Sequence, residues 1–306
     1  THEIIGKSSV KTTHDDKAGV ATGVVQAFQN CLRENGIDPK DVIFVAHSTT
    51  QATNALIEGD VANVGVIGVG PKGVGGWIAK AQTNMKDINL GSGRFIRLKN
   101  RFICDENLSD QLVTDTIKSL VGDGAQVIVA SESYGVDDME NETGICKIAK
   151  DMGLEATAAS EITKLYGLTR RTRTAAINAS ILPKMLNTAN STEQSVKSAG
   201  VEVPLMIMRG DGGVMEISEM KKRPVLTMLS GPAASVMGSL MYLRASNGVY
   251  FEVGGTTTNI GVIKDGRPAI DYSNVGGHRT YISSLDVRVL GVAGGSMVRA
   301  DKSGVK

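Results

Sequence analysis

Apolar and polar positions in the first half of the chain follow helix and strand periods in turn. Val20, Val24, Phe28 and Leu32 share one helix face, and Gly36 is a typical stop signal. Short apolar runs between such patterns are typical of strands buried inside a sheet. The predicted order is a strand over 3–12, a helix from about Lys17 to Gly36, a strand over 42–45, a helix opened by residues 47–50, a strand over 64–69, a helix around 113–120, a strand over 126–130, a helix over 140–152 and a strand over 154–159. This alternation predicts an α/β fold with helices against a parallel or mixed sheet.

A long helical pattern over residues 168–197 follows, and Pro183 is expected to interrupt it. We place a domain boundary within this segment, which divides the chain into residues 1–185 and 186–306. The helix begins with the basic run 170–173. Two interpretations stay open for that run: a solvated helix face, or a contact with an anion or with the other domain.

A hairpin over residues 251–261 carries the clearest chemical signal. A strand runs into Gly254 and Gly255, three threonines follow at 256–258, and a second strand resumes. Such a tip can present amide and hydroxyl donors to phosphate oxygens, although it can equally be an ordinary tight turn. Similar glycine-rich turns follow strands at 210–213 and 291–296, and several such turns could converge on one anion.

Composition limits the other possibilities. The 36 glycines among 306 residues exceed the usual ~7%, while aromatic residues make up only 4%, which favours an α/β protein with many tight turns. The net charge of +1 predicts no nucleic-acid partner. No apolar run approaches the ~20 residues of a membrane span. The three cysteines have no paired spacing, which indicates a reduced, cytoplasmic protein without a cysteine metal site.

Six blocks in this order resemble the hydantoinase A/5-oxoprolinase family. They cover nearly the whole chain: 47–56 (HSTTQATNAL), 170–178, 208–215, 223–234, the hairpin 251–261, and 285–296. The resemblance implies an actin/hexokinase/Hsp70-like (ribonuclease H-like) architecture of two α/β domains closing on ATP. Residues 1–185 would form the family's N-terminal domain, and 186–306 would begin its ATPase-like domain. Family members couple ATP cleavage to the opening of a cyclic amide, and relatives are subunits of ketone carboxylases.

The resemblance also implies roles for individual residues. The ATP phosphates would be held by Gly254, Gly255, Thr256, Thr257, Thr258, Gly294, Gly295 and Ser296. Asp211, Glu252 and Asn259 are the catalytic candidates, and Asp211 and Glu252 would also hold Mg²⁺. The substrate would contact His47, Thr49, Thr50, Asn54 and Arg209. Asp211 could instead form an Asx turn, and His47 could be a packing residue.

The chain departs from the family pattern in its acids and at its ends. Glu252 and Asn259 stand where the family usually has Asp, and Asn cannot act as a base. The family's first phosphate loop would precede Thr1, and its adenosine segment would follow Lys306, so we expect a chain that is incomplete at both ends. We therefore expect a subunit or fragment of an ATP-dependent hydrolase of hydantoins or 5-oxoproline, in a homo- or hetero-oligomer with a hydantoinase B-type subunit. The alternatives are a nucleotide-binding scaffold or reactivating-type ATPase, and the ATP-handling subunit of a ketone carboxylase.

Overall fold

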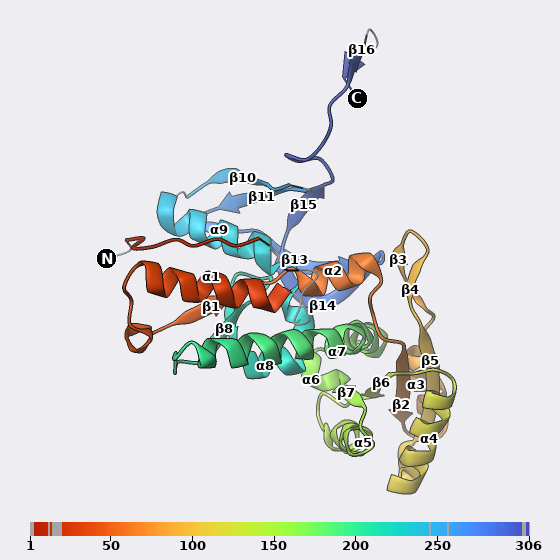
Figure 1. The fold of residues 1–306 in the computed structure, drawn as a ribbon. Helices are drawn as coiled ribbons and strands as arrows, with labels where there is room; N and C mark the ends of the chain where they lie inside the picture. Colours follow the sequence, from red (N-terminus) through yellow and green to blue (C-terminus); the bar gives the residue numbers. More distant parts are fainter. Residues whose placement is uncertain are drawn as a thin grey trace.

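The chain folds into a mixed α/β structure built around several small sheets. It is represented by a computed structural model that describes residues 3–11, 13, 20–244, 246–255, 257–301 and 304–305. Figure 1 shows a parallel sheet at one end, the long helix α7 (Leu168–Ser198) across the middle, and a hairpin sheet beside α9 (Ser230–Leu243) at the opposite end. The predicted α/β class is therefore confirmed at the level of secondary structure.

The parallel sheet has the strand order β5-β2-β6-β7. Its strands are β2 (Val64–Gly70), β5 (Leu98–Cys104), β6 (Val127–Glu132) and β7 (Glu155–Ala158). Every residue of β2 and β6 is buried, because helices cover both faces. One face packs on α4 (Asp110–Gly122) and α5 (Glu140–Asp151), and the other packs on α7. Burial on both faces explains the continuous apolar runs from which these strands were predicted.

Helix α7 differs from its prediction in two respects. It continues through Pro183 without a break, since packing along its length outweighs the hydrogen bond that proline cannot make. The solvated-face interpretation of residues 170–173 is wrong for Arg171 and Thr172, whose exposed fractions are 1% and 0%. Arg170 is half-buried, and its guanidinium donates to the Thr280 carbonyl. This basic run is therefore an internal contact region.

The second sheet pairs β1 (Val45–His47) in parallel with β8 (Leu205–Met208), which pairs antiparallel with β9 (Val214–Glu216). The strand predicted over 42–45 is displaced toward the C-terminus, and Ile43 is 89% exposed. The strand predicted over 3–12 is also wrong within 3–11, which adopt no regular structure. Thr12 lies outside the described residues.

The third sheet contains the predicted hairpin. Strands β10 (Gly248–Val253) and β11 (Thr258–Lys264) pair antiparallel, and β15 (Val287–Leu290) pairs with the other edge of β11. Helix α9 covers one face, where Ala233 and Val236 pack with Tyr250. The hairpin is therefore confirmed, with its tip between Val253 and Thr258.

Two further hairpins were not predicted. They are β3 (Ile88–Gly91) with β4 (Arg94–Ile96), and β13 (Ile270–Val275) with β14 (His278–Leu285). The hairpins contact each other where Gly276, at φ +58°, lies against the Asn89 carbonyl. The remaining elements are α1 (Val20–Glu34), α2 (Gln51–Glu58), α3 (Val74–Thr83), α6 (Ala159–Ile162), α8 (Ile217–Lys222), β12 (Arg267–Pro268), β16 (Ala300–Asp301), β17 (Gly304–Val305) and short 3-10 turns at Pro39–Asp41, Asp105–Asn107 and Pro224–Thr227. Within the described residues, none of the helices combines the length and apolar character needed to cross a membrane.

Candidate functional site

The tip of the β10–β11 hairpin contacts the glycine-rich segment that follows β15. We call residues 254–258 and 291–296 together the glycine clasp. Amides of the second segment donate to carbonyls of the first: Gly294 to Gly254 at 3.0 Å and Gly295 to Gly255 at 2.8 Å. Two of the three glycine-rich turns that were expected to converge therefore meet.

Some amide and hydroxyl groups of the glycine clasp already form hydrogen bonds within the protein. The Gly254 amide donates to the Thr257 carbonyl at 3.0 Å, and the Thr258 hydroxyl donates to the Val292 carbonyl at 2.6 Å. Within the described residues, the Thr257 hydroxyl donates no hydrogen bond. Of the two threonines of this tip that the structure describes, Thr257 is the one whose hydroxyl can serve a ligand.

The surface of the glycine clasp is open to solvent. Gly254, Gly255, Gly294, Gly295 and Ser296 are all exposed. Nothing lies within 4 Å of the position that a Cβ would take at Gly255, so a ligand can approach the backbone closely there. Thr256, also predicted to contact phosphate, lies outside the described residues.

The catalytic candidates of the hairpin are neighbours. Glu252 and Asn259 are cross-strand partners in β10 and β11, and Asn259 Nδ2 donates to Glu252 Oε2 at 3.2 Å. The other carboxylate oxygen accepts from Ser235 Oγ of α9 at 2.8 Å. Beside them, burial and the charges of Glu252 and Asp286 raise the pKa of Tyr250. Glu252 is thus oriented by two neutral donors on the α9 side of the sheet.

Asp211 occupies a different position, in the turn after β8. One carboxylate oxygen accepts from the Gly213 amide at 3.0 Å, and the other pairs with the Arg209 guanidinium. The Asx turn that was left open as an alternative is therefore present. The Nε atom of Arg209 is buried and has no hydrogen-bond partner, so this side chain retains a donor for a bound group.

Four of the predicted substrate residues, His47, Thr49, Thr50 and Asn54, lie at or after the carboxyl end of β1, in a region that meets the start of α9. The fifth, Arg209, follows β8. Ser230 Oγ donates to the Thr49 carbonyl at 2.8 Å, and the Leu229 amide donates to Thr53 Oγ1 at 3.2 Å. Asn54 Nδ2 makes a long bond of 3.4 Å to Thr50 Oγ1. The loops that follow β1 and β8 leave the same edge of a parallel pair, which is where open α/β sheets commonly bind ligands.

His47 belongs to this edge but is a partly enclosed side chain. Burial lowers its pKa below the usual value, so the imidazole is neutral at physiological pH. A neutral ring can donate one hydrogen bond and accept another, which fits either role considered for it.

The candidate side chains described above do not form a metal site in which all ligands come from the protein. No cluster of three or more His, Cys, Asp or Glu side chains suited to a metal occurs in the described part of the chain. Asp211 is paired with Arg209, and Glu252 accepts from Ser235 and Asn259. Any Mg²⁺ here would depend mainly on ligand oxygens and water.

Sequence reasoning missed two serines of this region. Ser235 orients Glu252, and Ser230 joins the start of α9 to the loop after β1. Ser230 was visible only as part of a small-residue helix start. The spacing between Ser235 and Glu252 gives no periodic signal, because the two residues lie on different elements.

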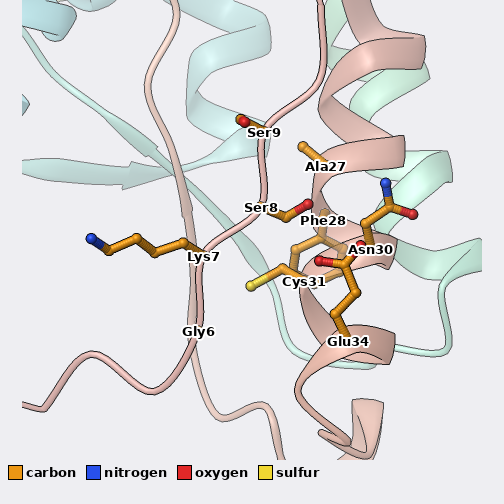
Figure 2. Close-up of a pocket in the computed structure, with 9 residues that line it drawn as sticks. All are labelled: Gly6, Lys7, Ser8, Ser9, Ala27, Phe28, Asn30, Cys31 and Glu34. Atoms are coloured by element: carbon orange, nitrogen blue, oxygen red, sulfur yellow. The ribbon is translucent and has the colours of Figure 1, made fainter.

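A separate hollow of 930 Å³ lies between the N-terminal segment and α1. Figure 2 shows Lys7 pointing away from α1, while Cys31 lies in the gap between the helix and the segment. Its lining residues are Gly6, Lys7, Ser8, Ser9, Ala27, Phe28, Asn30, Cys31 and Glu34. None of the predicted site residues lines it, so it is distinct from the region described above.

Two family models match the chain. One, described as the hydantoinase/oxoprolinase N-terminal region, matches residues 1–153, and the other, described as hydantoinase/oxoprolinase, matches residues 171–306. The acetophenone carboxylase gamma subunit of Aromatoleum aromaticum is 24% identical over 216 residues, which is 65% of this chain and 29% of that subunit.

Two solved structures share the fold. A nucleotide-free structure of the ATP-dependent acetone carboxylase matches 95% of this chain and 46% of its own, with a TM-score of 0.71 and 18% identity. The ATP-dependent caprolactamase from Pseudomonas jessenii matches 96% of this chain and 45% of its own, with a TM-score of 0.68 and 20% identity. The match spans less than half the length of each of these proteins. The actin/hexokinase-like fold class expected from the sequence is confirmed.

Proposed function

Because the chain belongs to the hydantoinase/oxoprolinase family, we propose that it is part of an ATP-dependent hydrolase that opens a cyclic amide of the hydantoin or 5-oxoproline type. ATP dependence is a property of both solved proteins that share its fold. One of them is a caprolactamase, whose name describes a lactam substrate. Residues 1–185 and 186–306 would contribute the two lobes.

The glycine clasp carries this proposal. It presents exposed backbone without side chains at Gly255, and the Thr257 hydroxyl has no internal partner among the described residues. Small residues and spare donors suit the oxygens of a phosphate. Bound ATP would supply the phosphoryl group that turns an amide oxygen into a good leaving group. Both segments of the glycine clasp would bind its phosphates, the second through Gly294, Gly295 and Ser296.

The other side chains would position the ring and the attacking group. Arg209 would donate its spare Nε–H to a developing negative charge. Glu252, fixed by Ser235 and Asn259, would orient water or a hydrated Mg²⁺ near the phosphates. Asn259 would act by holding Glu252 rather than as a base. Asp211 would act through Arg209, with which it pairs.

A ketone carboxylase is the second candidate, and specific matches favour it. The acetophenone carboxylase gamma subunit and the acetone carboxylase both resemble this chain. Either function fits a complex with further subunits, such as a hydantoinase B-type partner. The described cysteines are all free thiols, as is usual in the cytoplasm that we propose as its compartment.

The test measures ATP hydrolysis by the polypeptide in its native assembly with different second substrates. Stimulation by 5-oxoproline or a hydantoin, with ring-opened product formed in step with phosphate, would support the amide hydrolase. Stimulation only by a ketone together with bicarbonate would assign the carboxylase instead. ATP turnover unchanged by both sets would indicate a scaffold or reactivating-type ATPase.

A further inference from the structure

A cavity of 280 Å³ lies at the carboxyl ends of β2 and β6 in the parallel sheet. None of the residues assigned above to the phosphates, the ring or the metal lines it. Its walls come from the loop after β2, helix α3, the turn after β6 and the start of α7, and they include Ile78, Ala79, Gln82, Ser133, Leu168 and Arg171. The carboxyl edge of a parallel sheet is a common place for ligands, and this volume is close to the ~300 Å³ of the smallest ligand pockets.

Arg171 gives this cavity a buried positive charge. Its exposed fraction is 1%. Its terminal nitrogens donate to backbone carbonyls, Nη1 to Leu165 at 3.2 Å and Nη2 to Glu132 at 2.5 Å. Nε is buried and has no partner, and Arg171 forms no ion pair within the described ranges of the chain. Buried charges in proteins are usually paired, so this guanidinium lacks both a counter-charge in direct contact and a hydrogen-bond partner for Nε.

Ser133 provides a second unpartnered group on the same wall. Its Oγ atom is buried and makes no hydrogen bond. This hydroxyl is close to the backbone of β2, since a Cβ added at Gly70 would lie 3.1 Å from it. Both atoms belong to residues that line one cavity, and a bound ion or water is one of the explanations for buried polar atoms without partners.

The surrounding electrostatics favour an anion over a cation. The cavity includes Gly167 and Leu168, where the 31-residue helix α7 begins and its dipole is positive. Among the acids whose charges act on Arg171, Glu142 contributes most, ahead of Asp137 and Glu132. The Glu142 oxygens, however, accept from the Glu132 amide at 2.8 Å and from the Ser160 amide at 2.7 Å. Glu142 therefore acts on Arg171 only at longer range.

We propose that this cavity binds a small organic carboxylate. Because both atoms are closed off from solvent in the unliganded protein, rotation of the two side chains would bring Arg171 Nε to one carboxylate oxygen and Ser133 Oγ to the other. The short apolar body would lie against Ile78, Ala79 and Leu168. Two spare donors match the two oxygens of a carboxylate, whereas a phosphate would leave oxygens facing apolar walls. The inference is independent of the proposed ATP chemistry.

The test uses butyrate as the probe and the intact polypeptide, with binding followed by calorimetry. Butyramide, which has the same shape without the charge, and inorganic phosphate serve as comparison probes. The first variant is Ser133→Ala. Because its hydroxyl has no partner, its loss should leave the melting temperature of the unliganded protein unchanged or slightly higher. The matched control is Gln82→Ala, which alters the lining of the cavity without touching either unpartnered atom.

We expect saturable butyrate binding that weakens by about fivefold to tenfold in Ser133→Ala, as for the loss of one hydrogen bond. Gln82→Ala should bind butyrate as the parent protein does. Butyramide and phosphate should bind more weakly than butyrate. The proposal is overturned if butyrate does not saturate, if Ser133→Ala binds it equally well, or if butyramide or phosphate competes as strongly. A crystal structure in butyrate with an ordered water only at Arg171 Nε would also overturn it.

Discussion

Glu252 and Asn259 face each other across the β10–β11 hairpin, and the Asn259 amide donates to the Glu252 carboxylate at 3.2 Å. The resemblance noted in the sequence implies Asp at both positions, whereas here an acid stands opposite an amide that donates to it. The hydrogen bond, together with that from Ser235, fixes the orientation of Glu252 at the base of the glycine clasp. The identity of residue 259 therefore affects both the charge of the site and the stability of the hairpin.

Asn259→Asp should destabilise the protein at neutral pH. The substitution removes a hydrogen bond to a carboxylate and places a second negative charge beside it, with an expected loss of about 1 to 3 kcal/mol. The loss should shrink under acid conditions, where the two carboxyl groups can share a proton. Urea unfolding at neutral and acid pH measures this difference. The control Asn259→Ala lacks the new charge and should show little pH dependence, and equal behaviour of the two variants would contradict the prediction.

Thr257→Val should weaken nucleotide binding without affecting the fold. Its hydroxyl makes no internal hydrogen bond among the described residues, so the variant loses only a donor to the ligand, about tenfold in affinity. The matched control is Thr258→Val, which breaks the bond to the Val292 carbonyl and should lower the melting temperature. Calorimetric titration with ATP and thermal unfolding separate the two effects. Unchanged ATP affinity in Thr257→Val would remove this threonine from the phosphate site.

Gly295→Ala should open the glycine clasp. A Cβ at this position would lie 2.7 Å from the Gly255 carbonyl oxygen, closer than real Cβ contacts, whereas a Cβ at Gly291 would have open space. We expect Gly295→Ala to cost about 1 to 3 kcal/mol of stability and to weaken ATP binding, because the two segments must separate. Gly291→Ala should change neither property. ATP affinity that survives in Gly295→Ala would show that the contact between the two segments is not needed for binding.

The sequence predicted those elements that leave a signal in consecutive residues, such as an apolar run or a characteristic turn. Strands β2 and β6 are buried on both faces and therefore appear as apolar runs. The hairpin was recognisable from its Gly-Gly-Thr turn, and its register brings Glu252 opposite Asn259. The strand expected over 3–12 failed because apolar alternation does not supply a partner strand.

The contacts that define the sites could not be predicted in the same way. The bond between Gly294 and Gly254 joins segments about forty residues apart, and no spacing rule links them. The sequence left open whether Arg171 is solvated, because its partners, the carbonyls of Leu165 and Glu132, are backbone groups that every sequence contains. Ile43 looked like a core residue, although it is exposed. Burial of single residues depends on tertiary packing, which a local pattern does not report.

Glu132→Gln should stabilise the protein at neutral pH. Burial is the main cause that raises the pKa of the Glu132 carboxyl above its usual value of 4.5, with a smaller contribution from the charge of Glu142. The folded state therefore holds this proton more tightly than the unfolded state, and stability is lost as pH rises from 4.5 through the raised pKa. Glutamine removes the buried charge, and its carbonyl oxygen can still accept from Asn141 Nδ2, which lies 2.8 Å from the native carboxylate.

Thermal unfolding of Glu132→Gln should show a higher melting temperature than the parent at pH ~7. At pH ~4 the two melting temperatures should be nearly equal, because the Glu132 carboxyl of the parent is largely protonated in both the folded and the unfolded state. The control Glu106→Gln makes the same charge change at an exposed carboxylate paired loosely with Lys72, and it should show no comparable gain. A lower melting temperature for Glu132→Gln at neutral pH would mean that the ionised Glu132 stabilises the fold, contrary to the direction of its pKa.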